Sequence, residues 1–297
     1  MGPGHPECPQ RLDAITDHLR AIGLDVALDW REPPVASAEQ LSRAHDAAYV
    51  ATISAVLQAA ARDGQPHAVD PDTSANAGTW QAAMHAAGAA VAATDEVIAG
   101  RAKNAFCAVR PPGHHATRTQ AMGFCFFNNV VVAARHALEV HGLERVAVID
   151  FDVHHGNGTE DIVAGDSRML MCSFFQHPLY PYSGTQPTGD NLVNLPLAPY
   201  TRGGVMREKV EAAWIPALDT FKPQMLFISA GFDAHREDDL GQLGLIEADY
   251  AWLTELLMAV AQRHAGGRIV SCLEGGYALG ALARSVAAHL RVLAKLA

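Results

Sequence analysis

The chain has 297 residues, of which 49% are hydrophobic, so it can fill the core of one large α/β domain or of two small ones. Its formal net charge of −10 argues against direct binding to nucleic acid or to an anionic membrane surface. The five cysteines are widely spaced and form no CxxC pair, as is typical of free thiols in a reducing compartment. The sequence has neither an apolar run of membrane-spanning length nor an apolar signal region, so we predict a soluble cytoplasmic protein.

Predicted helices and strands alternate along the sequence. The helices are expected at residues 9–22, 39–61, 77–99, after 129 to about 141, from about 159, at 202–220, 247–265 and from 279 onward. The strands are expected at residues 104–109, 146–150, 169–174, 224–230 and 268–273, with loops at 62–75 and 175–190. This alternation predicts parallel βαβ units with right-handed connections. Because no linker or repeat divides the chain, residues 1–297 are predicted to form a single three-layer α/β domain, with a mostly parallel central sheet and helices on both faces.

The segment VAVIDFDVHHGNGT, residues 146–159, has the most informative pattern. Its apolar start is typical of a strand buried on both faces. Asp150, Asp152 and His154 follow at spacing i, i+2, i+4, which in an extended segment places the three side chains on one side. Mixed carboxylate and imidazole ligands favour zinc or a similar ion. The alternative is a strand-end loop with incidental polar residues, but such a cluster is costly to bury without a shared cation.

Further reactive residues follow three other predicted strands. His114 and His115 follow one strand, Asp233 follows another, and Tyr277 follows the last. Because ligands bind beyond the carboxyl ends of strands in open α/β sheets, these residues are expected to share one site. Each has a structural alternative: Asp233 as a helix N-cap, the histidines as solvated loop residues, and Tyr277 as a packed side chain in a glycine loop.

These groups together predict a reaction class. Asp152, His154 and Asp233 would give a metal three protein ligands, leaving a position open for water and substrate, as in catalytic zinc sites. A histidine would take the proton from water, and the Tyr277 hydroxyl would stabilise an oxyanion. The residues therefore predict metal-dependent hydrolysis of an amide, without identifying the amide.

Six motifs, in this order, resemble the histone deacetylase and acetylpolyamine amidohydrolase superfamily, with the class II-like bacterial deacetylases as the nearest group. They are HPE at 5–7, RPPGHH at 110–115, GFCFFNN at 123–129, DFDVHHGNGT at 150–159, SAGFDAH at 229–235 and LEGGY at 273–277. The resemblance covers essentially the whole chain. It implies an arginase-like α/β fold and a deacetylase or amidohydrolase activity.

The resemblance also implies a role for each catalytic residue. His115 would be the general base, and His114 its electrostatic or acid partner, oriented by Asp150. Tyr277 would polarise the acetyl carbonyl. Asn157 stands where class II relatives have Asn and class I relatives have Asp, which implies a less cationic His115.

The implied cofactors are one zinc ion, bound by Asp152, His154 and Asp233, and a structural potassium ion. One zinc is expected, because Gly156 occupies the position of a second-metal ligand in binuclear arginase-like enzymes. The potassium site would use the Asp150 side chain, the Ser173 hydroxyl and the backbone carbonyls of Asp152, His154 and Phe174. Arg11 stands where relatives line an internal channel for acetate.

The implied substrate-binding residues are Phe124 and Tyr180, as aromatic walls, together with Gly123, Gly276 and Leu240. Relatives usually have Phe in place of Tyr180, so the rim is expected to be more polar here. Polyamine-specific relatives can place an acidic residue where this chain has Leu240.

An acetylated lysine peptide is therefore the first expected substrate, and an acetylated polyamine or another acylated metabolite is the second. Asp70 and Asp72 lie where relatives place an acidic rim residue. A catalytically silent acetyl-ligand binding module is the distant alternative, and a homo-oligomer is possible. Relatives also carry a first strand before the segment with which this sequence starts, so the domain is expected to lack that strand.

Overall fold

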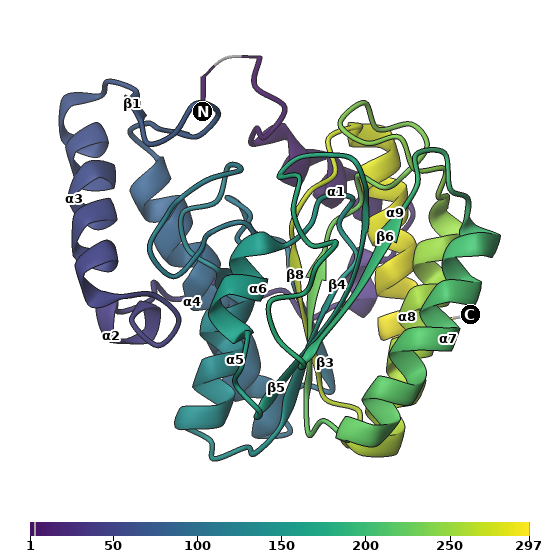
Figure 1. Ribbon diagram of the computed structural model, residues 1–297. Helices are drawn as coiled ribbons and strands as arrows, with labels where there is room; N and C mark the ends of the chain where they lie inside the picture. Colours follow the sequence, from purple (N-terminus) through teal and green to yellow (C-terminus); the bar gives the residue numbers. More distant parts are fainter. Residues whose placement is uncertain (3, 297) are drawn as a thin grey trace.

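The computed structural model describes residues 1–2 and 4–296, and a central six-stranded sheet organises them (Figure 1). The strand order is β3-β8-β7-β4-β5-β6, and every pair in it is parallel. The strands are β3 (Asn104–Cys107), β4 (Val146–Asp150), β5 (Met169–Gln176), β6 (Leu192–Leu197), β7 (Leu226–Ala230) and β8 (Ile269–Leu273). The predicted α/β fold with a mostly parallel sheet is confirmed, and this sheet is parallel throughout.

Helices cover both faces of the sheet, as its apolar strands require. On one face α1 (Gln10–Ala21), α7 (Gly203–Phe221), α8 (Glu247–His264) and α9 (Leu279–Leu293) contribute to one hydrophobic cluster. On the other face α3 (Ala47–Asp63), α4 (Thr79–Ile98), α5 (Asn129–Glu139) and α6 (Asn157–Val163) contribute to a second. Alternate residues of β4 face the two clusters, with Val146 and Val148 in one and Ala147 and Ile149 in the other.

The single helix predicted at residues 39–61 is wrong, because two helices, α2 (Ala38–Leu41) and α3, share this stretch. Ser37 and Gln40 form a capping box that starts α2. The chain then leaves the helix so that the buried His45 ring can contact the Thr117 carbonyl oxygen at 2.8 Å. Asp46 is extended, with φ −62° and ψ 135°, which separates α2 from α3.

Two other segments differ from the sequence prediction. The expected loop at 62–75 contains a small antiparallel hairpin, β1 (His67–Ala68) and β2 (Ser74–Ala75). Strand β6 was not predicted at all. It lies at the edge of the sheet and contains Pro196, which an edge strand tolerates but which lowers its strand signal. The short helix expected from about residue 159 begins at Asn157. The 3-10 turn η1 (Asp25–Ala27) completes the elements of the described residues.

Candidate metal centre and active site

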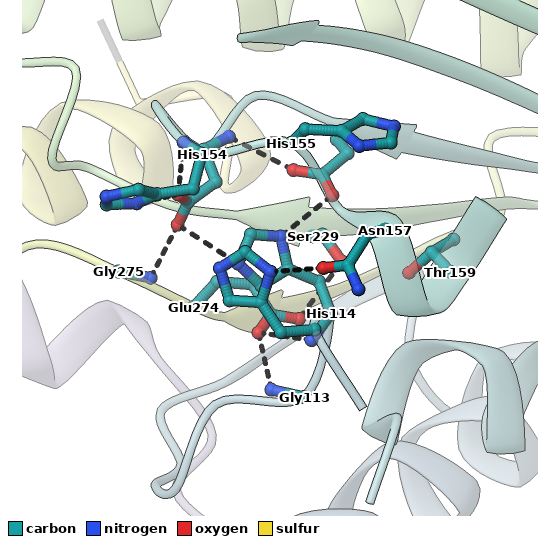
Figure 2. A network of polar contacts seen from close by, with 12 residues as sticks. Gly113, His114, His154, His155, Asn157, Thr159, Ser229, Glu274 and Gly275 are labelled. Atoms are coloured by element: carbon teal, nitrogen blue, oxygen red, sulfur yellow. Dashed lines mark hydrogen bonds and ion pairs between the residues drawn. The ribbon is translucent and has the colours of Figure 1, made fainter. Parts of the chain in front are cut away.

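The candidate site lies where β3, β4, β7 and β8 end. These four strands are adjacent in the sheet, so the segments that follow them meet at one edge. The loop after β3 carries His114 and His115, and Asp152 and His154 follow β4. Asp233 follows β7. The structure brings these residues together. One possible ligand atom from each of Asp152, His154 and Asp233 lies within 4.8 Å of the others. His114 Nε2 lies 3.8 Å from Asp152 Oδ2, and Figure 2 shows His114 and His154 in the same network of contacts.

The potential metal ligands Asp152, His154 and Asp233 converge. The sequence argument assumed that the segment after β4 is extended, but the chain bends there. The Nδ1 atom of His154 lies 3.0 Å from Oδ1 of Asp152 and 3.2 Å from Oδ2 of Asp233. Donor atoms bound to one tetrahedral zinc ion lie about 3.3 Å apart. Asp233 Oδ2 is buried and accepts no hydrogen bond from the described residues. This donor set fits a zinc ion.

Backbone contacts hold both carboxylates in place. Asp152 Oδ2 accepts a hydrogen bond of 2.8 Å from the N–H of Gly275, and Asp233 Oδ1 accepts one of 2.9 Å from Val153. A Cβ at Gly275 would lie 2.0 Å from Asp233 Oδ2, and one at Gly231 would lie 2.0 Å from Asp152 Oδ2. Only glycine fits at these two positions.

Gly275→Ala is therefore expected to displace the Asp233 carboxylate and to reduce bound zinc to well below one equivalent per chain. Zinc content after dialysis, measured by elemental analysis, checks this. Gly204→Ala is the matched control, because a Cβ there meets no atom within 4 Å and zinc content should be unchanged. Full zinc content in the Gly275 variant would contradict the steric argument.

His114 and His115 are buried side by side, with ring centroids 4.0 Å apart. His114 Nδ1 lies 3.0 Å from Asp150 Oδ2, and His115 Nδ1 lies 2.7 Å from Asn157 Oδ1. Burial and the neighbouring histidines His114 and His154 hold the pKa of His115 well below its ordinary value. Burial opposes protonation of His114 as well, but Asp152 and Asp150 outweigh it and raise the pKa of His114. The surroundings thus favour the neutral form of His115 and the charged form of His114.

The two aromatic side chains that the resemblance implies as substrate walls, Phe124 and Tyr180, lie beside these groups. The Tyr180 ring meets the His115 ring edge-on at 5.3 Å, and the Phe124 ring meets the Tyr277 ring edge-on at 6.1 Å. The guanidinium of the fully buried Arg11 lies 4.9 Å from the centre of the Tyr277 ring. Burial raises the pKa of Tyr277 well above its ordinary value, so its hydroxyl stays protonated and can donate.

The remaining predicted residues are placed as follows. A Cβ at Gly123 would meet the His115 ring at 2.4 Å, and the Gly276 carbonyl accepts a 2.7 Å hydrogen bond from Arg11 Nε. Ser173 pairs with Asp150 in the sheet register, and its buried Oγ has no hydrogen-bond partner among the described residues. The ring of Phe174 stacks on that of Trp214, with centroids 5.9 Å apart. Leu240 is half-buried and contributes a backbone N–H to Asp238 Oδ1 at 3.1 Å.

Sequence reasoning missed several residues that support the site. Glu274 accepts hydrogen bonds from the loop that carries the histidine pair. His155 lies 2.8 Å from Ser183 Oγ and 3.0 Å from Glu160 Oε2, which ties the loop of Tyr180 to α6. The sequence contained a partial signal for Glu274, because a carboxylate directly after a mostly apolar strand is expected to need buried partners.

A second group of possible ligands, Asp95, His136 and His141, lies between α4 and α5. Both imidazole Nε2 atoms contact Asp95 Oδ1, at 2.7 and 2.6 Å. Arg43 Nη1 lies 2.8 Å from His136 Nδ1 and must donate to it, so the proton of this imidazole is on Nε2 and points at Asp95. Hydrogen bonds therefore satisfy this group without an ion.

The comparisons with known proteins agree with this fold and site, which define an enzyme of the deacetylase and amidohydrolase class. Residues 5–293 match the histone deacetylase domain, and the chain belongs to that family. It is 39% identical to the histone deacetylase-like amidohydrolase of Pseudomonas aeruginosa over 92% of this chain and 73% of that one. It is 37% identical to a probable deacetylase of Archaeoglobus fulgidus over 95% of this chain and 79% of that one.

Two proteins with lower sequence identity are also similar to this chain. The mouse polyamine deacetylase HDAC10 is 36% identical over 97% of this chain and 44% of its own length. A crystal structure of the HDA15 HD domain superposes with a TM-score of 0.91 at 32% identity, covering 99% of this chain and 83% of that one. None of the helices in the described residues is both long and apolar enough to cross a membrane.

Proposed function

We propose that residues 1–297 act as one zinc-dependent catalytic domain that removes an acetyl or other short acyl group from an amine. The main supporting observation is that Asp152, His154 and Asp233 converge beside the buried His115, whose ring centre lies 5.9 Å from that of His154. Burial and the neighbouring histidines hold the pKa of His115 well below its ordinary value, which favours a neutral base. The unsatisfied Asp233 Oδ2 supports a cation at this point. Zinc bound there would polarise the amide carbonyl and acidify a water molecule.

The side chains around the ligands supply the proton transfers. Neutral His115 takes the proton of water as the water oxygen attacks the carbonyl carbon, and Asn157 fixes the orientation of its ring. Tyr277 donates a hydrogen bond to the oxyanion that develops on the acyl oxygen. When the C–N bond breaks, the amine nitrogen takes a proton from the histidine pair, and a carboxylic acid and a free amine leave. Asp152 and Asp150 favour the charged form of His114, and this charge would stabilise the negative charge that develops nearby.

A structural potassium ion belongs to the same proposal. The buried Ser173 hydroxyl, without a hydrogen-bond partner in the described residues, and the Asp150 carboxylate beside it offer the oxygen ligands that such a cation takes. Asp150 also lies 3.0 Å from His114 Nδ1, so this proposed cation site adjoins the histidine pair.

An acetylated lysine side chain is the proposed substrate. The hairpin of Asp70 and Asp72 is attached to the aromatic wall, because Thr73 Oγ1 accepts a 2.9 Å hydrogen bond from the N–H of Phe124. This contact supports the proposal that one of these carboxylates binds the backbone of a peptide substrate. Leu240 supplies no charge for a polyamine. An acetylated polyamine remains the second candidate, because relatives at 36% identity are named polyamine deacetylases.

The deciding experiment compares kcat/KM of the zinc-loaded protein for acetate release from an acetyl-lysine peptide and from acetylated putrescine or spermidine. We expect at least a tenfold preference for the peptide, about 1.4 kcal/mol of transition-state binding. A polyamine preference would reassign the substrate. Absence of turnover on either, with zinc bound and the fold intact, would contradict the acetyl specificity and direct attention to other acyl groups, then to a silent binding module.

A further inference from the structure

Glu274 is a buried carboxylate to which the steps above give no role. It directly follows β8 and is fully buried. Burial raises its pKa to about 7, although His114 and the N–H group of Gly113 act in the opposite direction. A carboxyl group is costly to bury unless hydrogen bonds compensate, so its contacts identify what it does.

Those contacts lie on the loop that carries the histidine pair (Figure 2). Glu274 Oε2 accepts a 2.6 Å hydrogen bond from the N–H of Gly113 and a 3.1 Å one from the N–H of His114. Oε1 accepts a 3.0 Å bond from the Ser229 hydroxyl on β7. One carboxylate therefore joins the loop after β3 to the ends of β7 and β8.

The hydrogen bond from the His114 N–H to Glu274 fixes the backbone of His114 on one side, and a second hydrogen bond fixes it on the other. The His114 carbonyl accepts a 3.0 Å hydrogen bond from the N–H of Thr159 at α6. The ring is in turn held by Asp150. With N–H, carbonyl and ring all engaged, the directions of His114 and of the adjoining His115 are determined together.

The next residue, Gly275, contacts the group of possible metal ligands. The N–H of Gly275 donates to the metal-ligand carboxylate of Asp152 at 2.8 Å, and the N–H of Glu274 donates to the Ala230 carbonyl at 3.0 Å. The dipeptide 274–275 thus contacts the histidine loop through a side chain and the metal-ligand group through its backbone. It sets the distance between the general base and the metal centre.

We propose that Glu274 is a positioning residue that places His115 against the metal-bound reaction centre through its hydrogen bonds to Gly113 and His114. This inference rests on the proposed function, because it assumes that His115 is the base. This positioning depends on the hydrogen bonds that the Glu274 side chain accepts and not on its negative charge. A misplacement of about 1 Å at such a group lowers the rate by about 100-fold.

Two variants separate the acceptors from the charge. In Glu274→Gln the side-chain oxygen can accept both N–H bonds and the amide can donate to Ser229, so kcat should stay within about fivefold of wild type. Glu274→Leu leaves both N–H groups buried without an acceptor. We expect its kcat to fall by about 100-fold, with KM within about twofold and one zinc per chain.

Ser271→Ala is the control for a structural effect. Ser271 lies on the same strand, is fully buried and lies 3.0 Å from His289 Nε2, away from the histidine pair. This variant should lower Tm without changing kcat. If Glu274→Leu, normalised to bound zinc, keeps kcat within threefold of wild type, the proposal is overturned. It is equally overturned if Glu274→Gln loses as much rate as Glu274→Leu.

Amide hydrogen exchange keeps this test independent of the proposed function. The Gly113 and His114 amides should exchange slowly in wild type and Glu274→Gln and at least tenfold faster in Glu274→Leu, with Gly275 unchanged. Wild-type protein without turnover would count against the proposed function, and the exchange rates would still decide whether Glu274 holds this loop. Equal exchange in all three proteins would refute the inference.

Discussion

Removing the metal ion with a chelator is expected to lower turnover by about 10³-fold or more, because the polarisation of the carbonyl and the acidification of water, worth several kcal/mol, are lost together. The three ligands are buried or nearly so, and Asp233 Oδ2 has no hydrogen-bond partner among the described residues. At free zinc 100 times above Kd, the bound ion adds about 2.7 kcal/mol to the free energy of unfolding. Tm should therefore fall by roughly 5–10 °C on metal removal.

Turnover, Tm and zinc content measured before chelation, after it and after reloading check this expectation. One equivalent of zinc per chain should restore both rate and Tm. His141→Ala is the control for the second histidine cluster, and its zinc content should stay at one. Full turnover of metal-free protein would contradict zinc dependence, and a second equivalent lost in the His141 variant would contradict the single-metal assignment.

Tyr277→Phe is expected to lower kcat by about 10²–10³-fold with little change in KM, since the hydroxyl donates its hydrogen bond mainly in the transition state. Burial keeps this phenol protonated, so the loss should be the same across the neutral pH range. The ring remains in place against Phe124 and Arg11, and zinc content should not change.

Tyr250→Phe is the matched control for Tyr277→Phe. Tyr250 is fully buried, its hydroxyl has no hydrogen-bond partner among the described residues, and its ring packs against Phe151 and Phe232. Its substitution should leave kcat unchanged. If the two variants have the same rate, Tyr277 does not stabilise the oxyanion.

The sequence was sufficient to predict the parts of the site that follow directly from strands. Apolar runs mark β4, β7 and β8 clearly, and the polar residues after them must meet at the carboxyl edge of a parallel sheet. The motif resemblance added the roles expected of His115 and Tyr277. The zinc, the potassium ion and the substrate remain predictions.

Contacts between residues that are far apart in the sequence could not be predicted in this way. The break between α2 and α3 depends on His45, whose partner Thr117 is far along the chain. Strand β6 has a weak local signal because it is an edge strand with a proline. In the sequence Glu274 is one residue of a loop motif. Its importance depends on its contacts with the N–H groups of Gly113 and His114, in the loop after β3.

The strand order has a consequence for the synthesis of the protein. Strand β3, which leads into the histidine loop, lies at the edge of the sheet and pairs with β8, more than half of the chain length later. A nascent chain that has emerged as far as the loop after β7 already contains Asp152, His154 and Asp233, but it still lacks β8, the strand with which β3 pairs. Folding therefore depends on a very long-range pairing, which is intrinsically slow. The loop with His114 and His115 can therefore take its place beside Asp152 and Asp233 only after β8 has left the ribosome.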